Sequence, residues 1–474
     1  MKATVKELAG IAGRATLGAL DLCQSAVLQA ALAGGRLSVD VARRVPTLLP
    51  KDLDARYRSA LDEIRADLEG LPAEALRVDV AALVSSWGKV LAGAASPADR
   101  RAVDGLLRAF QVKALHGAER FTAPGAFPVA PTPRTLVHRS GTLELYRYRR
   151  PGEPVTPKGA PPVLIVYSII NRSYVLDLME GYSFVRQLLD DGLDVWIVEW
   201  GAATRGDRET TLDRWLLTDL PSCLDAIEKV TGAPRVSLLG HCMGGVFASA
   251  FAALSPDRID RLLTLTTPFT VAEGGLVSLL TDPRLFPVDA LVDGFGLMPG
   301  KLIRLTFLLL KPWYEAMRWR AFLDNVANDR GLDLFFAADT WVNDNPDLHG
   351  EVFRAFVKTV YFEDRLRNRA MRAGERTVDL GNVTCPVLNV AAQKDWVVPP
   401  RSAAVAAEAF RSHDYRYLEV EGFHVSLFFD PRLRGRWAEL SAFLAEKRSD
   451  GVSETRPKAK RKTAPARPVR RAAG

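Results

Sequence analysis

The sequence has few of the residues on which disulfide scaffolds and metal sites are built. Of its 474 residues, only four are cysteine and six are histidine, and no two cysteines have C-x-x-C spacing. Scattered cysteines in a chain this long argue against a disulfide framework or a zinc site and are typical of a reducing compartment. A G-x-G-x-x-G loop is also absent, which argues against dinucleotide binding. We therefore expect a cytoplasmic protein without a metal or a cofactor of its own.

Long apolar runs are missing as well. The most apolar stretch near the N-terminus, residues 15–35, contains Asp21 and Gln24 and falls short of a transmembrane helix. Lys6 and Arg14 interrupt the apolar core that a signal peptide would need. The sequence thus predicts neither a membrane span nor a secretory leader.

Positive charge is concentrated at one end of the chain. The formal net charge is +7, but residues 447–474 hold ten Lys/Arg and two Asp/Glu, so the remaining residues sum to about −1. This segment is poor in apolar bulk and is expected to be a disordered basic tail. A solvated tail and weak contact with an anionic surface or nucleic acid are the two interpretations. The folded body is not expected to bind nucleic acid.

The rest of the chain divides into three parts. Residues 1–120 are rich in Ala and Leu and predict a helical region. One helix in it, "VKELAGIAGRATLGALDLCQSAVLQAAL", either packs on the main body or docks on a partner subunit or a lipid-like surface. Strand and helix patterns alternate over 131–268 and 386–446, which is typical of a mainly parallel sheet covered by helices on both faces. Between them, residues 269–385 show no obvious strand and predict an inserted helical cap.

The predicted strands can be placed individually. A hairpin is expected about Ser140-Gly141. The apolar run at 161–170 predicts a buried strand, and further strands are expected at 193–200, 235–240, 259–268, 386–395 and 415–424.

One stretch, "SLLGHCMGGVFASAFAAL" (237–254), predicts a strand, a tight turn and a helix. Within it, Gly240-His241-Cys242-Met243-Gly244 fits the G-x-S-x-G elbow with cysteine at the nucleophile position. Glycines flank the turn because strand and helix crowd it. The amide-rich start of the helix favours a thiolate. A buried structural cysteine is the alternative.

A nucleophile of this kind needs a base and an acid that orients the base. In the elbow fold they follow at the ends of later strands, in the order nucleophile, acid, histidine. Asp395 follows one such strand and His424 the last one, so Cys242, Asp395 and His424 are the predicted triad. The other histidines lie elsewhere or beside the nucleophile: His116, His138, His241, His349 and His413.

The oxyanion hole is expected from backbone N–H groups. The N–H of Met243 follows the nucleophile directly. A second donor is expected in the turn after the first buried strand, near Ile170-Asn171.

The chain resembles the polyhydroxyalkanoate synthases, α/β-hydrolase-fold enzymes, and among them the class III catalytic subunit, over about residues 131–446. The resemblance lies in "LIVYSIINRSYVLDLMEGYSFVRQLLDDGLDVWIVEWG", "GLMPGKLIRLTFLLLKP", "WVNDNPDLHGEVFRAFVKTVY" and "VDLGNVTCPVLNVAAQKDWVVPP". It implies a Cys-Asp-His triad at Cys242, Asp395 and His424. It further implies polymerisation of (R)-3-hydroxyacyl-CoA with release of coenzyme A, a second synthase subunit or a homodimer, and association with polyester granules.

Departures from the family pattern indicate residues at the substrate mouth. Family members usually have an apolar residue before the nucleophile, Gln after it, His after the aspartate and Gly before the histidine. Here these positions hold His241, Met243, Trp396 and Phe423. We take His241, Trp396 and Phe423 as candidate mouth residues. Two other functions remain open: an esterase, thioesterase or depolymerase that uses the same triad, and a granule- or partner-binding protein with a weakened site.

Overall fold

A computed structural model of the chain describes residues 129–152, 159–271, 277–278, 281–310 and 329–446. The predicted N-terminal helical region (1–120) and basic tail (447–474) lie outside the described residues. Within the described ranges, no helix is long and apolar enough to cross a bilayer.

The core is an eight-stranded sheet in the order β1-β2-β6-β3-β7-β8-β11-β12. The first two strands form the predicted hairpin, and β2 also pairs antiparallel with β6, whereas all neighbours from β6 to β12 are parallel. Every predicted strand is present, which confirms the mainly parallel α/β class. The strands are β1 (Arg134–Ser140), β2 (Leu143–Tyr148), β3 (Pro162–Val166), β6 (Asp194–Glu199), β7 (Val236–His241), β8 (Ile259–Leu265), β11 (Val387–Ala392) and β12 (Tyr415–Val420).

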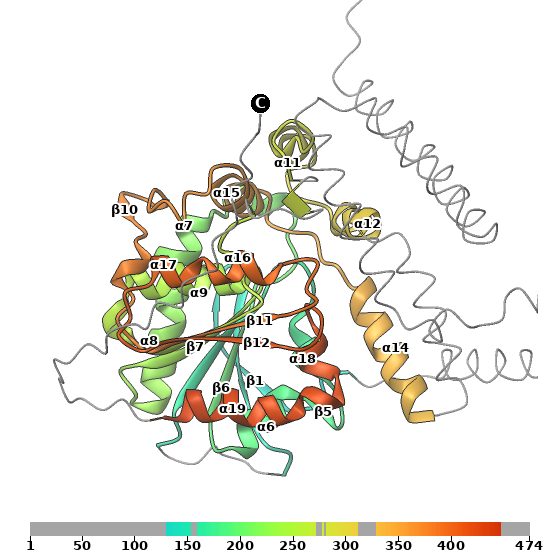
Figure 1. Ribbon diagram of the computed structural model, residues 1–474, viewed down its shortest axis with the longest axis vertical. Coiled ribbons are helices and arrows are strands. Elements are labelled where there is room, and N and C mark those ends of the chain that lie inside the picture. The colour runs from blue at the N-terminus through green and yellow to red at the C-terminus, as the bar shows by residue number, and fades with distance from the viewer. Residues whose placement is uncertain (1–128, 153–158, 272–276, 279–280, 311–328, 447–474) are drawn as a thin grey trace, which may run out of the picture.

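Helices cover both faces of this sheet (Figure 1). One face packs against α8 (Leu220–Thr231), α9 (Met243–Leu254) and α17 (Ala406–Ala409), and the other against α6 (Phe184–Asp190) and α19 (Arg434–Ala445). The central strands β3 and β7 are buried along their whole length. Their unbroken apolar runs reflect this position, because a strand covered on both sides has no solvent face.

Local signals set where the helices begin and end. The Ser183 side chain accepts a hydrogen bond from the N–H of Arg186 (2.9 Å) and caps the start of α6. Gly192, just after that helix, and Gly232, at the end of α8, have φ angles of 88° and 75°. Only glycine adopts this conformation at little cost, so both helices end there.

The region predicted as a cap is mostly helical where the structure describes it. It contains α11 (Val288–Phe295), α12 (Gly300–Leu310), α14 (Asp329–Asn343), α15 (Gly350–Phe356) and the π-helix η7 (Val357–Phe362). Helices α11, α12 and α15 lie together above one end of the sheet (Figure 1). The expectation of no strand here is wrong in one place, because Arg372–Ala373 and Arg376–Thr377 form a two-residue hairpin, β9 and β10. Such a short hairpin leaves no periodicity in the sequence.

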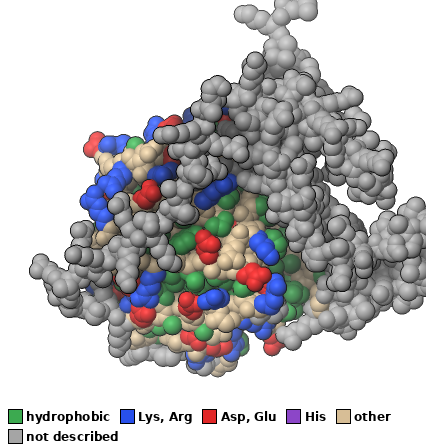
Figure 2. Space-filling model, viewed as in Figure 1, with side chains coloured by type: hydrophobic (Ala, Val, Ile, Leu, Met, Phe, Trp, Pro, Cys, Tyr) green, Lys and Arg blue, Asp and Glu red, His purple; other side chains and the backbone are tan. Residues whose placement is uncertain are grey.

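Charges on the described body are mixed. On the face formed by β12 and α19, Lys and Arg are interspersed with Asp and Glu (Figure 2). Arg416, for example, pairs with Asp414 and Glu446, and Arg436 pairs with Glu439. This face, as far as the structure describes it, therefore has no single basic patch of the kind that binds a nucleic acid backbone.

Candidate active site

Cys242 occupies the sharp turn between β7 and α9. Its backbone has φ 53° and ψ −126°, a conformation that non-glycine residues rarely adopt. Its N–H donates to the Leu265 carbonyl (3.0 Å), and its carbonyl accepts from the N–H of Gly245 (2.9 Å). Strain of this kind persists only where the surroundings impose it, and it is typical of functional turns. The thiol is buried but not sealed, since Cys242 is 8% exposed.

The glycines around Cys242 are required by close backbone contacts. A Cβ on Gly240 would lie 2.4 Å from the Cα of Gly245, and a Cβ on Gly244 would lie 2.1 Å from the Val166 carbonyl oxygen. Real Cβ atoms do not approach so closely. The strand, the helix and the turn after β3 can therefore meet at the elbow only without side chains at these positions.

Asp395 and His424 approach each other from the ends of β11 and β12. The Nδ1–H of His424 donates to Oδ2 of Asp395 (2.7 Å). Oδ1 of the same carboxylate accepts from the N–H groups of Val397 and Val398, both at 2.9 Å. The carboxylate is fully buried and held on both oxygens, so it orients the imidazole rigidly.

The backbone after β12 is shaped for this contact. Gly422 has a φ of 124°, and a Cβ there would lie 2.2 Å from Oγ of Ser426. The N–H of Lys394 donates to the Gly422 carbonyl (2.9 Å), which ties the two strand-end loops together. The glycine allows the turn that brings His424 back over the sheet.

His424 completes the connection to the thiol. Its ring hydrogen-bonds to Asp395, and it lies close enough to Cys242 for the charge of that side chain to act on it. Burial alone would lower the pKa of His424, but the charges of Asp395 and Cys242, together with the hydrogen bond to Asp395, outweigh it and raise that pKa to about 10. The arrangement therefore favours a protonated imidazole between a carboxylate and a sulfur.

A match to the model of the α/β-hydrolase fold family covers residues 161–431, more than half of the chain. The Poly(3-hydroxyalkanoate) polymerase subunit PhaC of Allochromatium vinosum is 34% identical over 320 residues, which cover 66% of this chain and 88% of that relative. The protein of the same name from Synechocystis sp. is 33% identical over 313 residues, which cover 64% and 81%.

The chain belongs to the polyhydroxyalkanoate synthase family of the α/β-hydrolase superfamily. It is therefore an enzyme of the acyltransferase type, which confirms the resemblance seen in its sequence. Among solved structures, Est1E from Butyrivibrio proteoclasticus has a TM-score of 0.41 and 18% identity, covering 66% of this chain and 98% of that chain.

The predicted oxyanion donors differ in whether their N–H groups already have an acceptor in the structure. Met243 is the first residue of α9, so its N–H is among those without an acceptor inside the helix. The N–H of Ile170, in contrast, donates to Oγ of Ser168 (3.3 Å), and the Asn171 side chain reaches the Trp341 carbonyl (3.5 Å).

The N–H of Ile170 is thus engaged by a neighbouring hydroxyl in this structure, and the backbone N–H groups of Ile170 and Asn171 stay a prediction for the second oxyanion donor. The part of the turn that adjoins the elbow lies earlier in the chain, because a Cβ on Gly244 would touch the backbone of Val166 and Tyr167. The sequence shows the turn but not how far it extends past the sheet.

The prediction that His241 lies at the substrate mouth is wrong. It is only 2% exposed, and its ring lies between Tyr167 and His424. Residues alternate their direction along a strand, and the last residue of β7 turns into the core. His241 therefore lies behind the His424 imidazole and not at an opening.

Trp396 and Phe423 lie nearer the surface. The half-buried Trp396 ring meets Phe307 of α12 edge-on, with centroids 6.4 Å apart, and both pack with Val271 and Val277. Phe423 is 45% exposed. Apolar side chains of the cap thus gather around Trp396, the residue that follows Asp395 in the chain.

Two tyrosines near the thiol escaped the sequence reasoning. Tyr361 of η7 packs in the same cluster as Trp396, and Tyr167 follows β3 directly. Burial raises the pKa of each well above its ordinary value, and the charge of Cys242 adds to the effect, so both phenols stay protonated. No motif marks them, since only the fold brings them to Cys242.

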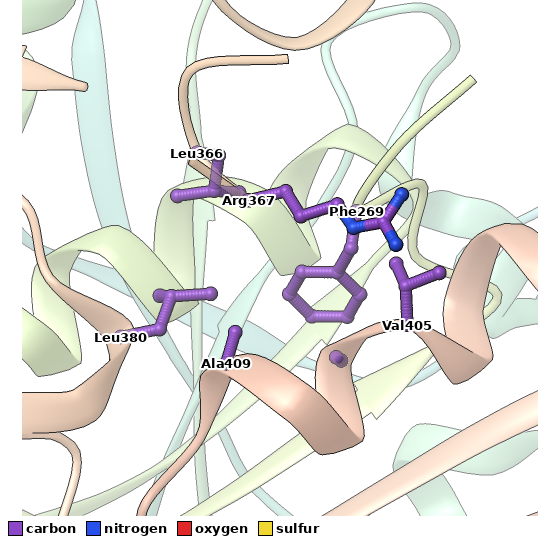
Figure 3. A pocket seen from close by; sticks show the side chains of 7 residues that line it. Phe269, Leu366, Arg367, Leu380, Val405 and Ala409 are labelled. Carbon is purple, nitrogen blue, oxygen red and sulfur yellow. The ribbon is translucent and has the colours of Figure 1, made fainter. Parts of the chain in front are cut away.

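The described residues contain no second candidate active site with comparable chemistry. A small pocket shown in Figure 3 has apolar walls with Arg367, and no triad residue lines it. Among the described residues, no three His, Cys, Asp or Glu side chains are grouped as metal ligands.

Proposed function

We propose that this enzyme polymerises (R)-3-hydroxyacyl-CoA into polyester, with Cys242 carrying the acyl group as a thioester. The observation that carries the proposal is the Asp395–His424 hydrogen bond beside Cys242, which occupies a strained elbow. Membership of the polyhydroxyalkanoate synthase family supports the same reaction. Coenzyme A enters as part of the substrate, so we propose no separate cofactor.

In the first step, the thiolate of Cys242 attacks the thioester carbonyl of the substrate. The negative oxygen that forms lies at the start of α9, where the Met243 N–H can donate to it. The carbon–sulfur bond to coenzyme A then breaks, and His424 gives its proton to the departing sulfur. The products are an acyl-Cys242 thioester and free coenzyme A.

In the second step, neutral His424 removes the proton from the hydroxyl of another hydroxyacyl unit. That oxygen attacks the acyl-Cys242 carbonyl, an ester bond forms, and the Cys242 thiolate leaves beside the newly protonated His424. Sulfur suits this role because exchange between two thioesters is nearly balanced in energy. The acyl group consequently stays reactive toward the hydroxyl.

The mouth residues bear on the competition between hydroxyl and water. Trp396, which follows Asp395 in the chain, forms an apolar wall with Phe307 and Val271. Such a wall favours an acyl chain and disfavours ordered water. We therefore place polymerisation ahead of the esterase, thioesterase or depolymerase alternative.

Partners and location follow from the same proposal. The relatives are named as polymerase subunits. We propose that this chain works in the cytoplasm at the surface of the polyester granule, with a second synthase subunit or as a homodimer.

One assay tests the proposed function. Purified protein is incubated with (R)-3-hydroxybutyryl-CoA, with and without a candidate second subunit, while free thiol and turbidity are followed together. We expect thiol and insoluble polymer from the wild type and neither from Cys242→Ala. Thiol with only soluble acid would assign a hydrolase instead. No thiol under either condition would support a binding protein with a weakened site.

A further inference from the structure

His241 is a buried polar residue that neither the fold nor the proposed chemistry explains. Its ring stacks on Tyr167 with centroids 5.0 Å apart and planes 11° apart. It also contacts the His424 ring at 5.2 Å and meets the Phe428 ring edge-on at 5.1 Å. A phenylalanine would fill the same space, so packing alone does not call for an imidazole.

The polar atoms of this ring are costly where they lie. Nδ1 and Nε2 of His241 are both buried, and neither makes a hydrogen bond to the described residues. The His424 carbonyl is close enough to influence the ring, yet it lies outside hydrogen-bond geometry. Unpaired buried polar atoms destabilise a fold, so their presence in a native structure indicates a compensating role.

His241 remains neutral. Burial, together with the charge on His424, holds the pKa of His241 well below its ordinary value. The titratable side chains whose rings contact it are Tyr167, which burial keeps protonated, and His424. Among the described residues, the charged group against the ring is therefore the proposed general base.

We propose that His241 is a positioning residue that presents a neutral polar wall to His424 and thereby favours the protonated imidazole beside the Cys242 thiolate. Tyr167 supports the wall by stacking on its other side. A buried cation is more stable against a polar ring than against a hydrocarbon one, because dipoles replace part of its lost hydration. This inference rests on the proposed function, in which His424 and Cys242 form that ion pair.

The test is the pH profile of Cys242 alkylation by iodoacetamide, which follows the thiolate and needs no substrate. Cys242→Ala provides the blank for the other cysteines. The acid limb of this profile is the pH range over which the alkylation rate rises with pH. We expect His241→Phe to move the acid limb upward by about one pH unit, so that at a given pH on the limb the thiolate is about tenfold less abundant. The matched control Phe428→Leu changes another ring contact of His241 without adding or removing a polar atom, and it should leave the limb in place.

A His241→Phe profile that superimposes on the wild-type profile would show that the ring only fills space. If that variant does not fold, His241→Gln and His241→Leu replace it, and the limb must move further with Leu than with Gln. Equal movement of the two would overturn the proposal. Alkylation needs no acyl transfer, so the two proposals can fail separately. If the wild type makes no polymer but His241→Phe shifts the acid limb of alkylation, only the proposed function is contradicted. If the wild type makes polymer but the limb of His241→Phe does not shift, only this inference is contradicted.

Discussion

The contact between Asp395 and His424 predicts a specific pH dependence of stability. The pKa of His424 is raised from 6.5 to about 10, and the charge of Asp395 is the largest of the causes that raise it. At 1.36 kcal/mol per pKa unit, this shift corresponds to at most about 5 kcal/mol. Cys242 contributes part of the shift, so we expect about 2–3 kcal/mol from Asp395 alone.

The sign follows from proton binding. Between pH 6.5 and the raised pKa, folded His424 keeps a proton that the unfolded chain has lost. Raising the pH therefore favours unfolding, and the stabilisation is present below pH 6.5 and is lost as the pH rises through the folded pKa. Asp395→Asn removes the charge while its side-chain oxygen can still accept from the N–H groups of Val397 and Val398.

The measurement is urea unfolding from about pH 6 to pH 10. Both proteins carry Cys242→Ala, so that no thiol titrates at this site. We expect the protein that retains Asp395 to lose about 2–3 kcal/mol more across this range than the Asp395→Asn protein. Asp414→Asn, which removes a surface partner of Arg416, serves as the control. Parallel curves for the Asp395 and Asp395→Asn proteins would refute the charge argument.

Three further predictions concern the elbow, the mouth and the tail. Gly244→Ala should destabilise the fold by about 3 kcal/mol or more in thermal unfolding, because its Cβ would meet the Val166 carbonyl at 2.1 Å. Gly435→Ala, in α19 with open space around it, should instead gain about 0.5–1 kcal/mol, and similar losses in both would contradict the steric account. Trp396→Ala should raise the kcat/KM for (R)-3-hydroxyhexanoyl-CoA relative to the hydroxybutyryl thioester by about tenfold. Leu136→Ala, at an exposed position of the edge strand β1, should leave that ratio unchanged, and an unchanged ratio in Trp396→Ala would remove Trp396 from the acyl site. Deleting residues 449–474 should preserve the rate of thiol release from soluble substrate, whereas a large loss of kcat would show that this segment acts at the site.

The sequence by itself determined the sheet and the identity of the three residues at its strand ends. The apolar runs and the glycines around Cys242 are local signals, and each can be recognised within about ten residues of sequence. The chain order of elbow, acid and histidine then assigned Asp395 and His424 before any contact was known. The short β9–β10 hairpin was missed because a two-residue strand is too short to show the alternation of side chains that marks a strand in a sequence.

Tertiary structure decided what surrounds these three residues. Tyr361 and Trp396, which are far apart in the chain, both pack against Val271 and Val277, and no local pattern records such contacts. The Ile170 N–H was already used by a neighbouring hydroxyl. His241, adjacent to Cys242 in sequence, lies behind His424 because a strand alternates the direction of its side chains. Local pattern thus specifies which residues end the strands, and packing between distant segments specifies which of them touch.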